Sequence, residues 1–308
     1  MASVKLTEQM KERQLLSFEL FPPKTDKGME NLPGTIEHLC QFEPEYISVT
    51  YGAGGGNVGA NREVCQMVKK AGTVPVTHFT VIKNTKEGIR DQLETYLSEG
   101  VDHILALRGD FPRGEHSTGG DFNYATDLVK FIRREFGDKF EIAVAGSPEG
   151  HIACRSLDAD VSVLKMKQDN GADYIMTQLC WDMEQFARWQ DKIRKAGVTM
   201  PIDVGIMPIL DQAATISMAL SRNGCVMDRE LSRLISKYWI FPNPFDKAPF
   251  DDNLEQKKED FKKVGIEYTI RQIDKYRALG VEGIHLYALN KWKDVSEIIN
   301  ASGMRTQI

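Results

Sequence analysis

The stretch "EGVDHILALRGDFP" (99–112) contains a complete passage from a helix to a strand. The amphipathic segment Glu87–Ser98 comes before it, and Gly100 follows that segment as a glycine follows many helix ends. The next residues are apolar on both faces, which is typical of a parallel strand covered on both sides. The apolar run ends at Arg108, and Asp110 comes soon after. The stretch therefore predicts one repeat of an alternating α/β fold, with polar groups at the end of its strand.

Apolar runs of this kind recur along the chain at residues 15–21, 46–50, 74–79, 103–108, 141–146, 173–178, 201–207 and 283–289. Helical spacing between them is clearest at Glu87–Ser98, Tyr124–Glu135, Asp160–Asn170, Asp182–Lys195 and Lys262–Leu279. Eight such units in 308 residues match a closed (β/α)8 barrel, the TIM-barrel fold. An open doubly wound sheet is the alternative, but the chain lacks the GxGxxG and P-loop signatures that usually mark nucleotide-binding open sheets.

The interval between the seventh and eighth runs is unusually long. Its spacing predicts an extra helix at Met227–Lys237, followed by a loop in the proline-rich and aromatic residues 239–253. No stretch has the composition of a linker, so we predict a single domain over residues 1–308.

Composition excludes several classes of protein. The net charge of -5 comes from interspersed charges of both signs, without the basic stripe that a nucleic-acid partner requires. No apolar run is long enough to span a membrane, and the first residues are too polar for a signal peptide, so we expect a cytoplasmic protein. Five scattered cysteines without a CxxC pair predict reduced thiols rather than disulfides or a metal site.

Polar residues gather where the predicted strands end, which is where (β/α)8 barrels place their functional side chains. These residues are Glu19, Thr50, Tyr51, His78, Arg108, Asp110, Ser147, Glu149, His151, Gln178, Tyr287 and Asn290. A barrel does not need such a set for stability. The pattern therefore predicts a site at this end of the barrel.

Single residues in this set leave two interpretations open. Glu19 has apolar neighbours, so it is either paired or functional, and burial would raise the pKa of its carboxyl and make it a proton donor. His78 is more typical of a hydrogen-bonded core histidine than of a functional residue, and Arg108 could pair with Asp110 instead of binding a ligand. The glycine-rich residues 51–61 fit no nucleotide signature, so we predict a turn or a lid there.

Seven segments, taken in order, resemble the methylenetetrahydrofolate reductases. They are "SFELFPPK" (17–24), "ISVTYGAGG" (47–55), "VTHFT" (76–80), "ILALRGD" (104–110), "SPEGH" (147–151), "GADYIMTQ" (171–178) and "LYALN" (286–290). The first and fourth segments are specific to that family, and the others add weight because they occur in series. The resemblance covers nearly the whole chain and also implies a (β/α)8 barrel.

The resemblance implies reduction of 5,10-methylenetetrahydrofolate to 5-methyltetrahydrofolate, with bound FAD as the hydride carrier and a reduced nicotinamide as the usual source. It implies FAD contacts at Thr50, His78, Leu107, Arg108, Gly109, Asp110, Tyr124, Ala125, Ser147, His151, Asp160 and Lys167. It implies folate contacts at Asp110, Gln178, Tyr287 and Lys291. No metal is expected.

The family also suggests catalytic roles. Glu19 is expected to be the acid that protonates N10 of the folate as the five-membered ring opens, and Asp110 to stabilise the cation that forms and to tune the flavin. Arg108 and Lys167 are suited to the FAD pyrophosphate, since one presents a planar fork and the other a point charge.

Three positions differ from the pattern of well-known relatives. Ser147 stands where many have tyrosine, Gln212 follows Asp211 where bacterial relatives present a phenylalanine that packs on the substrates, and Lys291 replaces an arginine. We therefore expect altered stacking and folate binding. We expect NADH as the electron donor by default, while another donor or a partner protein in a larger complex remains open. The chain could also form a homo-oligomer.

Two other functions remain as alternatives. Another flavin barrel, such as a proline dehydrogenase-like enzyme, would share the architecture. A non-enzymatic adhesive protein would display Arg108, Gly109 and Asp110 on an exposed loop, but the apolar run before them and the absence of a secretion signal argue against it.

Overall fold

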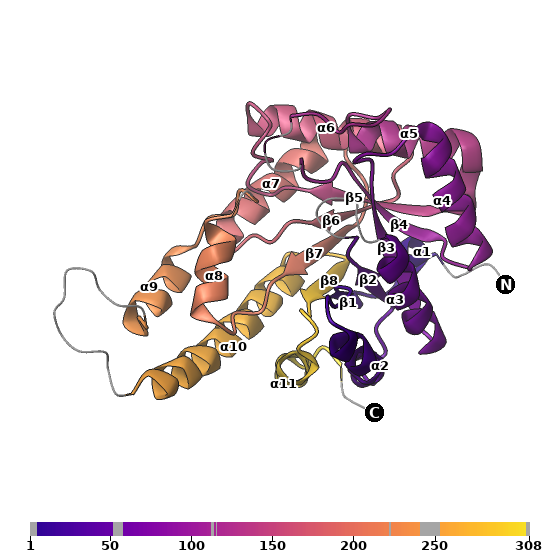
Figure 1. The fold of residues 1–308 in the computed structure, drawn as a ribbon. Helices are drawn as coiled ribbons and strands as arrows, with labels where there is room; N and C mark the ends of the chain where they lie inside the picture. Colours follow the sequence, from indigo (N-terminus) through magenta and orange to yellow (C-terminus); the bar gives the residue numbers. More distant parts are fainter. Residues whose placement is uncertain are drawn as a thin grey trace.

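The computed structural model describes residues 5–51, 58–111, 114, 116–221, 223–240 and 253–305. Its centre is a closed barrel of eight parallel strands in chain order (Figure 1). The strands are β1 (Leu15–Leu20), β2 (Tyr46–Val49), β3 (Val74–Thr80), β4 (His103–Leu107), β5 (Glu141–Gly146), β6 (Tyr174–Thr177), β7 (Ile202–Ile206) and β8 (Gly283–Tyr287). Because β8 pairs with both β7 and β1, the barrel prediction is confirmed and the open sheet is excluded.

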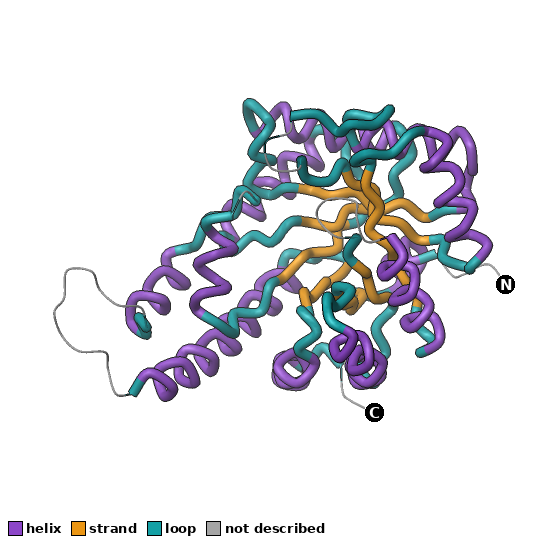
Figure 2. Tube along the Cα trace, viewed as in Figure 1, coloured by secondary structure: helices purple, strands orange, loops and turns teal. Residues whose placement is uncertain are grey.

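Helices cover the outside of this barrel (Figure 2). They are α1 (Leu6–Glu12), α2 (Asp26–Cys40), α3 (Val58–Lys70), α4 (Lys86–Ser98), α5 (Ala125–Phe136), α6 (Leu157–Asp169), α7 (Met183–Lys195), α8 (Gln212–Ala219), α9 (Arg229–Lys237), α10 (Leu254–Ala278) and α11 (Trp292–Ser302). A short 3-10 turn, η1 (Gly137–Lys139), precedes β5. Within the described residues, no helix has the length and the apolar character needed to cross a membrane.

The interval between β7 and β8 differs most from the sequence prediction. The extra helix expected at Met227–Lys237 is present as α9, but α8 precedes it and was not predicted. The helix α10 begins at Leu254, whereas apolar spacing placed its start at Lys262. Its first two turns, "LEQKKEDF" (254–261), are mostly charged, so periodicity does not mark them. Most of the predicted loop, residues 241–252, lies outside the described residues.

The helices α8, α9 and the first half of α10 project together from one side of the barrel (Figure 1). A buried apolar cluster joins Leu231 and Ile235 of α9 to Phe261 of α10 and to Ile209, which follows β7. Gly265 lets α10 approach closely, because a Cβ at that position would collide with the carbonyl of Ile209. This projecting group therefore begins at the carboxyl end of β7 and is continuous with the packing there.

The helix α1 closes the amino-terminal end of the barrel. Glu141 of β5 accepts hydrogen bonds from the backbone nitrogens of Leu6 and Thr7, at 2.6 and 2.9 Å. His103 of β4 places its two ring nitrogens 2.7 Å from Asp102 Oδ1 and 3.0 Å from Glu141 Oε2. Burial opposes protonation of this ring, but the two carboxylates outweigh burial and raise the pKa of His103 to about 9. A cationic His103 thus stabilises the carboxylate of Glu141, which accepts hydrogen bonds from the backbone of α1.

We expect the free energy of unfolding to fall as the pH rises from about 6.5 toward about 9. The folded-state pKa of His103 lies above its unfolded value of 6.5, so this stabilisation is complete below 6.5 and is lost through about 9. The shift corresponds to roughly 3 kcal/mol. Urea titrations across this pH range should show the loss in the unaltered chain and in a control, His116→Gln, at an exposed position. The same slope in His103→Gln would contradict the assignment.

Candidate active site

The register of the strands places several polar side chains inside the barrel. Side chains alternate between the two faces of a strand. Ser17 is paired with His285 and Glu19 with Tyr287 between β1 and β8, and Glu19 is also paired with Ser48 of β2. These five residues therefore share the interior face, with Glu19 and Tyr287 nearest the carboxyl end of the barrel.

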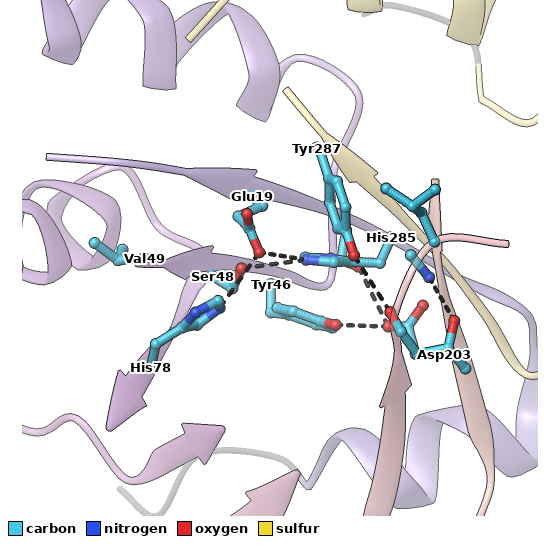
Figure 3. A network of polar contacts seen from close by, with 12 residues as sticks. Glu19, Tyr46, Ser48, Val49, His78, Asp203, His285 and Tyr287 are labelled. Carbon is cyan, nitrogen blue, oxygen red and sulfur yellow. Dashed lines mark hydrogen bonds and ion pairs between the residues drawn. The ribbon is translucent and has the colours of Figure 1, made fainter. Parts of the chain in front are cut away.

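Glu19 lies between two histidines (Figure 3). Its Oε2 is 3.4 Å from Nε2 of His78 on β3 and 3.7 Å from Nε2 of His285 on β8. Burial raises the pKa of Glu19, but the close contact with His285 and the charges of both histidines outweigh burial, so the net pKa is lowered. The prediction of a raised pKa is therefore wrong for the ligand-free chain. The local sequence shows the apolar neighbours of Glu19 but not the two histidines, which come from other strands.

A chain of polar contacts continues into the barrel below this carboxyl. Nδ1 of His285 lies 2.7 Å from Ser17 Oγ, and Nε2 lies 3.2 Å from Ser48 Oγ. Asp203 of β7 places its Oδ2 3.3 Å from Ser17 Oγ and accepts a hydrogen bond of 2.6 Å from the Tyr46 hydroxyl. Burial raises the pKa of Asp203 to about 6, although the charge of His285 and the two hydroxyl donors lower it. Together with Glu19 and His78, residues of five strands thus form one connected network (Figure 3).

Tyr287 and Gln178 lie at the same end of the barrel. The Tyr287 hydroxyl donates to the carbonyl of Thr177 at 3.3 Å. Gly205 of β7 leaves room for this contact, since a Cβ there would collide with both groups. Gln178 uses its side-chain carbonyl to accept from the Leu179 backbone nitrogen, at 2.9 Å. A hydroxyl and an amide are thus available on this side of the mouth.

Two cations at this end form no direct ion pair within the described residues. Lys167 of α6 donates to the carbonyl of Ala145 at 2.7 Å, and Arg108 lies over the ring of Phe111, with its Cζ 4.5 Å from the centroid. Neither cation forms an ion pair with a carboxylate in the part of the chain that the structure describes. Burial, together with the charges of Arg108 and Lys167, lowers the pKa of His151. Two cations without a direct ion pair suit an anionic ligand with several oxygens, such as a pyrophosphate.

Arg108 and Asp110 do not pair with each other. Arg108 donates from Nε to the carbonyl of Gly109 at 3.2 Å, and Asp110 is exposed. Gly109 has a φ of 86°, and a Cβ there would come within 2.6 Å of Ile82 and 3.0 Å of Thr80. Only glycine fits this turn without strain. The Arg-Gly-Asp tripeptide is therefore the segment that directly follows β4, with a glycine required at its middle position.

The remaining residues that the resemblance implied as cofactor contacts also lie on this end, in strand ends or in the segments that follow them. They are Thr50, Leu107, Tyr124, Ala125, Ser147, His151 and Asp160. Tyr124, just before α5, is 62% exposed, so its ring is free to contact a ligand. Of the glycine-rich segment 51–61, residues 52–57 lie outside the described residues.

Two of the positions that differ from the family pattern lie in different environments, one buried and one exposed. Gln212 is 1% exposed and its amide nitrogen donates to the carbonyls of Ile235 and Tyr238, at 3.1 and 3.0 Å. Its side-chain oxygen accepts from the Ile240 backbone nitrogen at 3.2 Å. Gln212 therefore ties α8 to the end of α9 and does not replace a stacking ring. Lys291 is exposed immediately before α11.

Sequence reasoning missed Ser17, Ser48, Asp203 and His285. A signal for them exists, because polar residues alternate with apolar ones inside otherwise apolar runs, as Ser17 and Glu19 do in "LLSFEL" (15–20). Polar residues two positions apart in a buried strand face the same side. Their partners, however, depend on the register of other strands.

Comparison with known sequences identifies the family of this chain. The sequence model named "Methylenetetrahydrofolate reductase" matches residues 5–235 and 241–303. The chain belongs to this family. A 5,10-methylenetetrahydrofolate reductase of Escherichia coli (strain K12) is 31% identical over 291 residues, which cover 94% of this chain and 91% of that protein.

Fungal and plant methylenetetrahydrofolate reductases are longer. "Methylenetetrahydrofolate reductase 1" of Schizosaccharomyces pombe is 33% identical over 298 residues, covering 96% of this chain and 47% of its own. "Methylenetetrahydrofolate reductase (NADH) 1" of Arabidopsis thaliana is 34% identical over 301 residues, covering 94% and 48%. The chain thus spans about half the length of these two relatives.

The fold is also found among solved structures, one of which covers nearly the whole of this chain. It is described as an uncharacterized protein from Clostridium thermocellum that binds two copies of 5-methyl-5,6,7,8-tetrahydrofolic acid. The two chains superimpose with a TM-score of 0.61 over 97% of this chain and 100% of the other. At 12% identity, this likeness concerns the barrel alone.

Proposed function

We propose that the chain reduces 5,10-methylenetetrahydrofolate to 5-methyltetrahydrofolate as a flavin-dependent enzyme. The observation that carries this proposal is the carboxyl of Glu19, held between His78 and His285 at the open end of a barrel of this family. The bacterial relative with that activity in its name matches over 91% of its own length.

FAD is the cofactor that fits the residues present. Arg108 and Lys167 offer two cations without a direct ion pair among the described residues, which suits the two phosphates of FAD. We propose that the cofactor is held by Thr50, His78, Leu107, Arg108, Gly109, Asp110, Tyr124, Ala125, Ser147, His151, Asp160 and Lys167. When bound, FAD supplies the carrier that passes a hydride between donor and folate.

Glu19 is proposed as the proton donor to N10 of the folate. Opening of the folate ring leaves a cation and requires a proton on the departing nitrogen. Because the pKa of Glu19 is lowered by its histidines in the ligand-free chain, this carboxyl must first take a proton from a neighbour. His78 and His285 are the groups close enough to supply it.

The folate is proposed to contact Asp110, Gln178, Tyr287 and Lys291. Asp110 is exposed at the mouth, where an ionised carboxylate offsets the positive charge of the opened ring. Tyr287 and Gln178 provide a hydroxyl and an amide for the polar edge of the pterin. Lys291, a flexible point charge, is suited to the glutamate tail.

NADH is the proposed electron donor, in line with the plant relative whose name includes it. A partner protein in a larger complex is the alternative source of electrons. A homo-oligomer is compatible with either electron donor. Anaerobic stopped-flow measurements with NADH and NADPH, each mixed with the oxidised protein, compare the two nicotinamides directly. No flavin reduction by either would point to the partner protein.

One experiment tests the proposed function as a whole. The purified protein should be yellow, with flavin absorption at about 450 nm, and its FAD should be reduced by light under anaerobic conditions. Addition of methylenetetrahydrofolate should then restore the absorption of the oxidised flavin, while proline should fail to reduce the oxidised protein. The reverse pattern would favour a proline dehydrogenase-like enzyme, and a colourless protein without flavin affinity would contradict both.

Replacing Asp110 with asparagine should slow reoxidation of the flavin by the folate about tenfold to a hundredfold, because the cation loses its counter-charge. The free energy of unfolding should change little, since Asp110 is exposed. Single-turnover absorbance at several folate concentrations separates the rate from the affinity. A normal limiting rate with weaker affinity would make Asp110 a binding residue alone.

A further inference from the structure

Asp203 is a buried carboxyl that the proposed reaction has not yet used. It is fully buried on β7, and Gly283 of β8 leaves room for it, because a Cβ there would come within 2.6 Å of Asp203 Cγ. Its Oδ2 accepts from Tyr46 and Ser17, while its Oδ1 has no hydrogen-bond partner among the described residues. Burying a carboxylate is costly unless partners offset the cost. Its position beside Ser17, which contacts His285, points to an effect on that ring.

The direction of these hydrogen bonds follows from the hydrogens available. The pKa of Asp203 is about 6, so at neutral pH it is ionised and can only accept. The single hydroxyl hydrogen of Ser17 then points at Asp203, and the Ser17 oxygen accepts from Nδ1 of His285, 2.7 Å away. Neutral His285 therefore carries its hydrogen on Nδ1. Its Nε2 lone pair faces Ser48 and Glu19.

We propose that Asp203, acting through Ser17, is a positioning residue that fixes this tautomer of His285. Nε2 of His285 then carries the proton that Glu19 passes to the folate. The proposal rests on the proposed function and identifies the source of the proton that Glu19 lacks in the ligand-free chain.

The proton balance is as follows. The transfer begins from the imidazolium form of His285 and the carboxylate form of Glu19, with 3.7 Å between Nε2 and Oε2. When substrate excludes water, the Nε2–H bond of His285 breaks and the proton moves to Glu19, either directly or through the Ser48 hydroxyl. Both groups are then neutral, which is favoured in a site without water because burial disfavours charged groups. Glu19 gives the proton to the leaving nitrogen, and His285 regains one from water after product release. The hydrogen on Nδ1 of His285 remains hydrogen-bonded to Ser17 Oγ throughout, so no side chain has to turn.

His78 also faces Glu19, at 3.4 Å, but it is the weaker source of a proton. Burial and the charge of His285 lower the pKa of His78, against the opposite effect of Glu19, so the protonated form of His78 is disfavoured. Its Nε2 has no hydrogen-bond partner within the described part of the chain, so no contact fixes its tautomer as Ser17 fixes that of His285.

Two variants test the link. Asp203→Val removes the acceptor with a residue suited to a strand, and Ser17→Ala breaks the bridge while Asp203 keeps its bond to Tyr46. Tyr174→Phe is the matched control, because this hydroxyl is buried in the same barrel and bonds nothing among the described residues. The first readout is the 15N NMR spectrum of the ligand-free proteins with labelled histidine at alkaline pH. A His285→Gln variant identifies the signals of that ring.

The second readout is flavin kinetics in the holoenzyme. The unaltered chain and Tyr174→Phe should show His285 protonated on Nδ1, and both test variants should shift the hydrogen to Nε2. Reoxidation of the photoreduced flavin by the folate should slow about tenfold or more in both variants, with reduction by NADH unchanged.

An Nδ1 hydrogen retained in both variants, or equal loss in the two half-reactions, would overturn the proposal. Failure of the proposed function is distinct from this. In that case the unaltered chain shows no reaction with the folate, while the NMR spectra still report whether Asp203 sets the tautomer.

Discussion

Replacing Glu19 with glutamine should slow folate-dependent reoxidation of the flavin by about 100- to 10,000-fold, because general acid catalysis contributes that much to rates. Glutamine has nearly the same size and keeps a polar contact with His78 and His285, so the barrel should fold normally. It has no proton to give to the leaving nitrogen. Binding of FAD and its reduction by the donor should therefore stay within about twofold of normal, as neither step needs this proton.

The two half-reactions are measured separately by stopped-flow absorbance under anaerobic conditions. Glu149→Gln is the matched control, since Glu149 is another carboxyl after a barrel strand but accepts from the Val226 backbone nitrogen, at 3.1 Å, instead of facing the histidines. It should leave the folate half-reaction within about twofold of normal. Unchanged turnover in Glu19→Gln would exclude Glu19 as the proton donor to the folate. It would also exclude the proposed proton transfer from His285 to Glu19.

Replacing Lys167 with methionine should weaken FAD binding by about 10- to 100-fold, the range expected when a hydrogen bond from a charged group is lost. Methionine keeps most of the apolar stem of lysine and removes only the charge. Lys167 forms no direct ion pair among the described residues, although the charge of Asp160 raises its pKa against the effect of burial. The double variant with Arg108→Ala added should be nearly colourless after purification, because it no longer retains FAD.

Affinity is measured by titrating flavin-free protein with FAD and following flavin fluorescence. Lys165→Met is the matched control on the same helix, because Lys165 pairs with Asp169 on the surface. It should bind FAD with normal affinity. Equal affinity in Lys167→Met and the control would place the pyrophosphate elsewhere.

The sequence predicted the barrel well and its additions less well. Eight apolar runs alternating with helices were enough, because a strand covered on both faces is apolar along its whole length whatever its neighbours are. The start of α10 at Leu254 and the presence of α8 were missed. Those segments are stabilised by contacts with α9 and with the end of β7, so their own spacing carries little signal.

The candidate site was predicted as a set of strand ends but not as a set of contacts. Glu19, Arg108, Gln178 and Tyr287 stand next to the strand boundaries, which local patterns mark. The lowered pKa of Glu19 could not be predicted, because it depends on two histidines from β3 and β8 that parallel pairing brings within 3.4 and 3.7 Å. The buried setting of Gln212 likewise depends on the end of α9.

The sequence by itself determined the alternation of strands and helices, the polar residues at the strand ends and the resemblance to one enzyme family. Only the tertiary structure decided that Glu19 is charged in the ligand-free chain, that Arg108 is not paired with Asp110, and that Asp203 lies beneath His285. The physical reason is that hydrophobic periodicity is a local property, whereas the pKa of a side chain depends on charges and hydrogen bonds that barrel closure brings from distant strands.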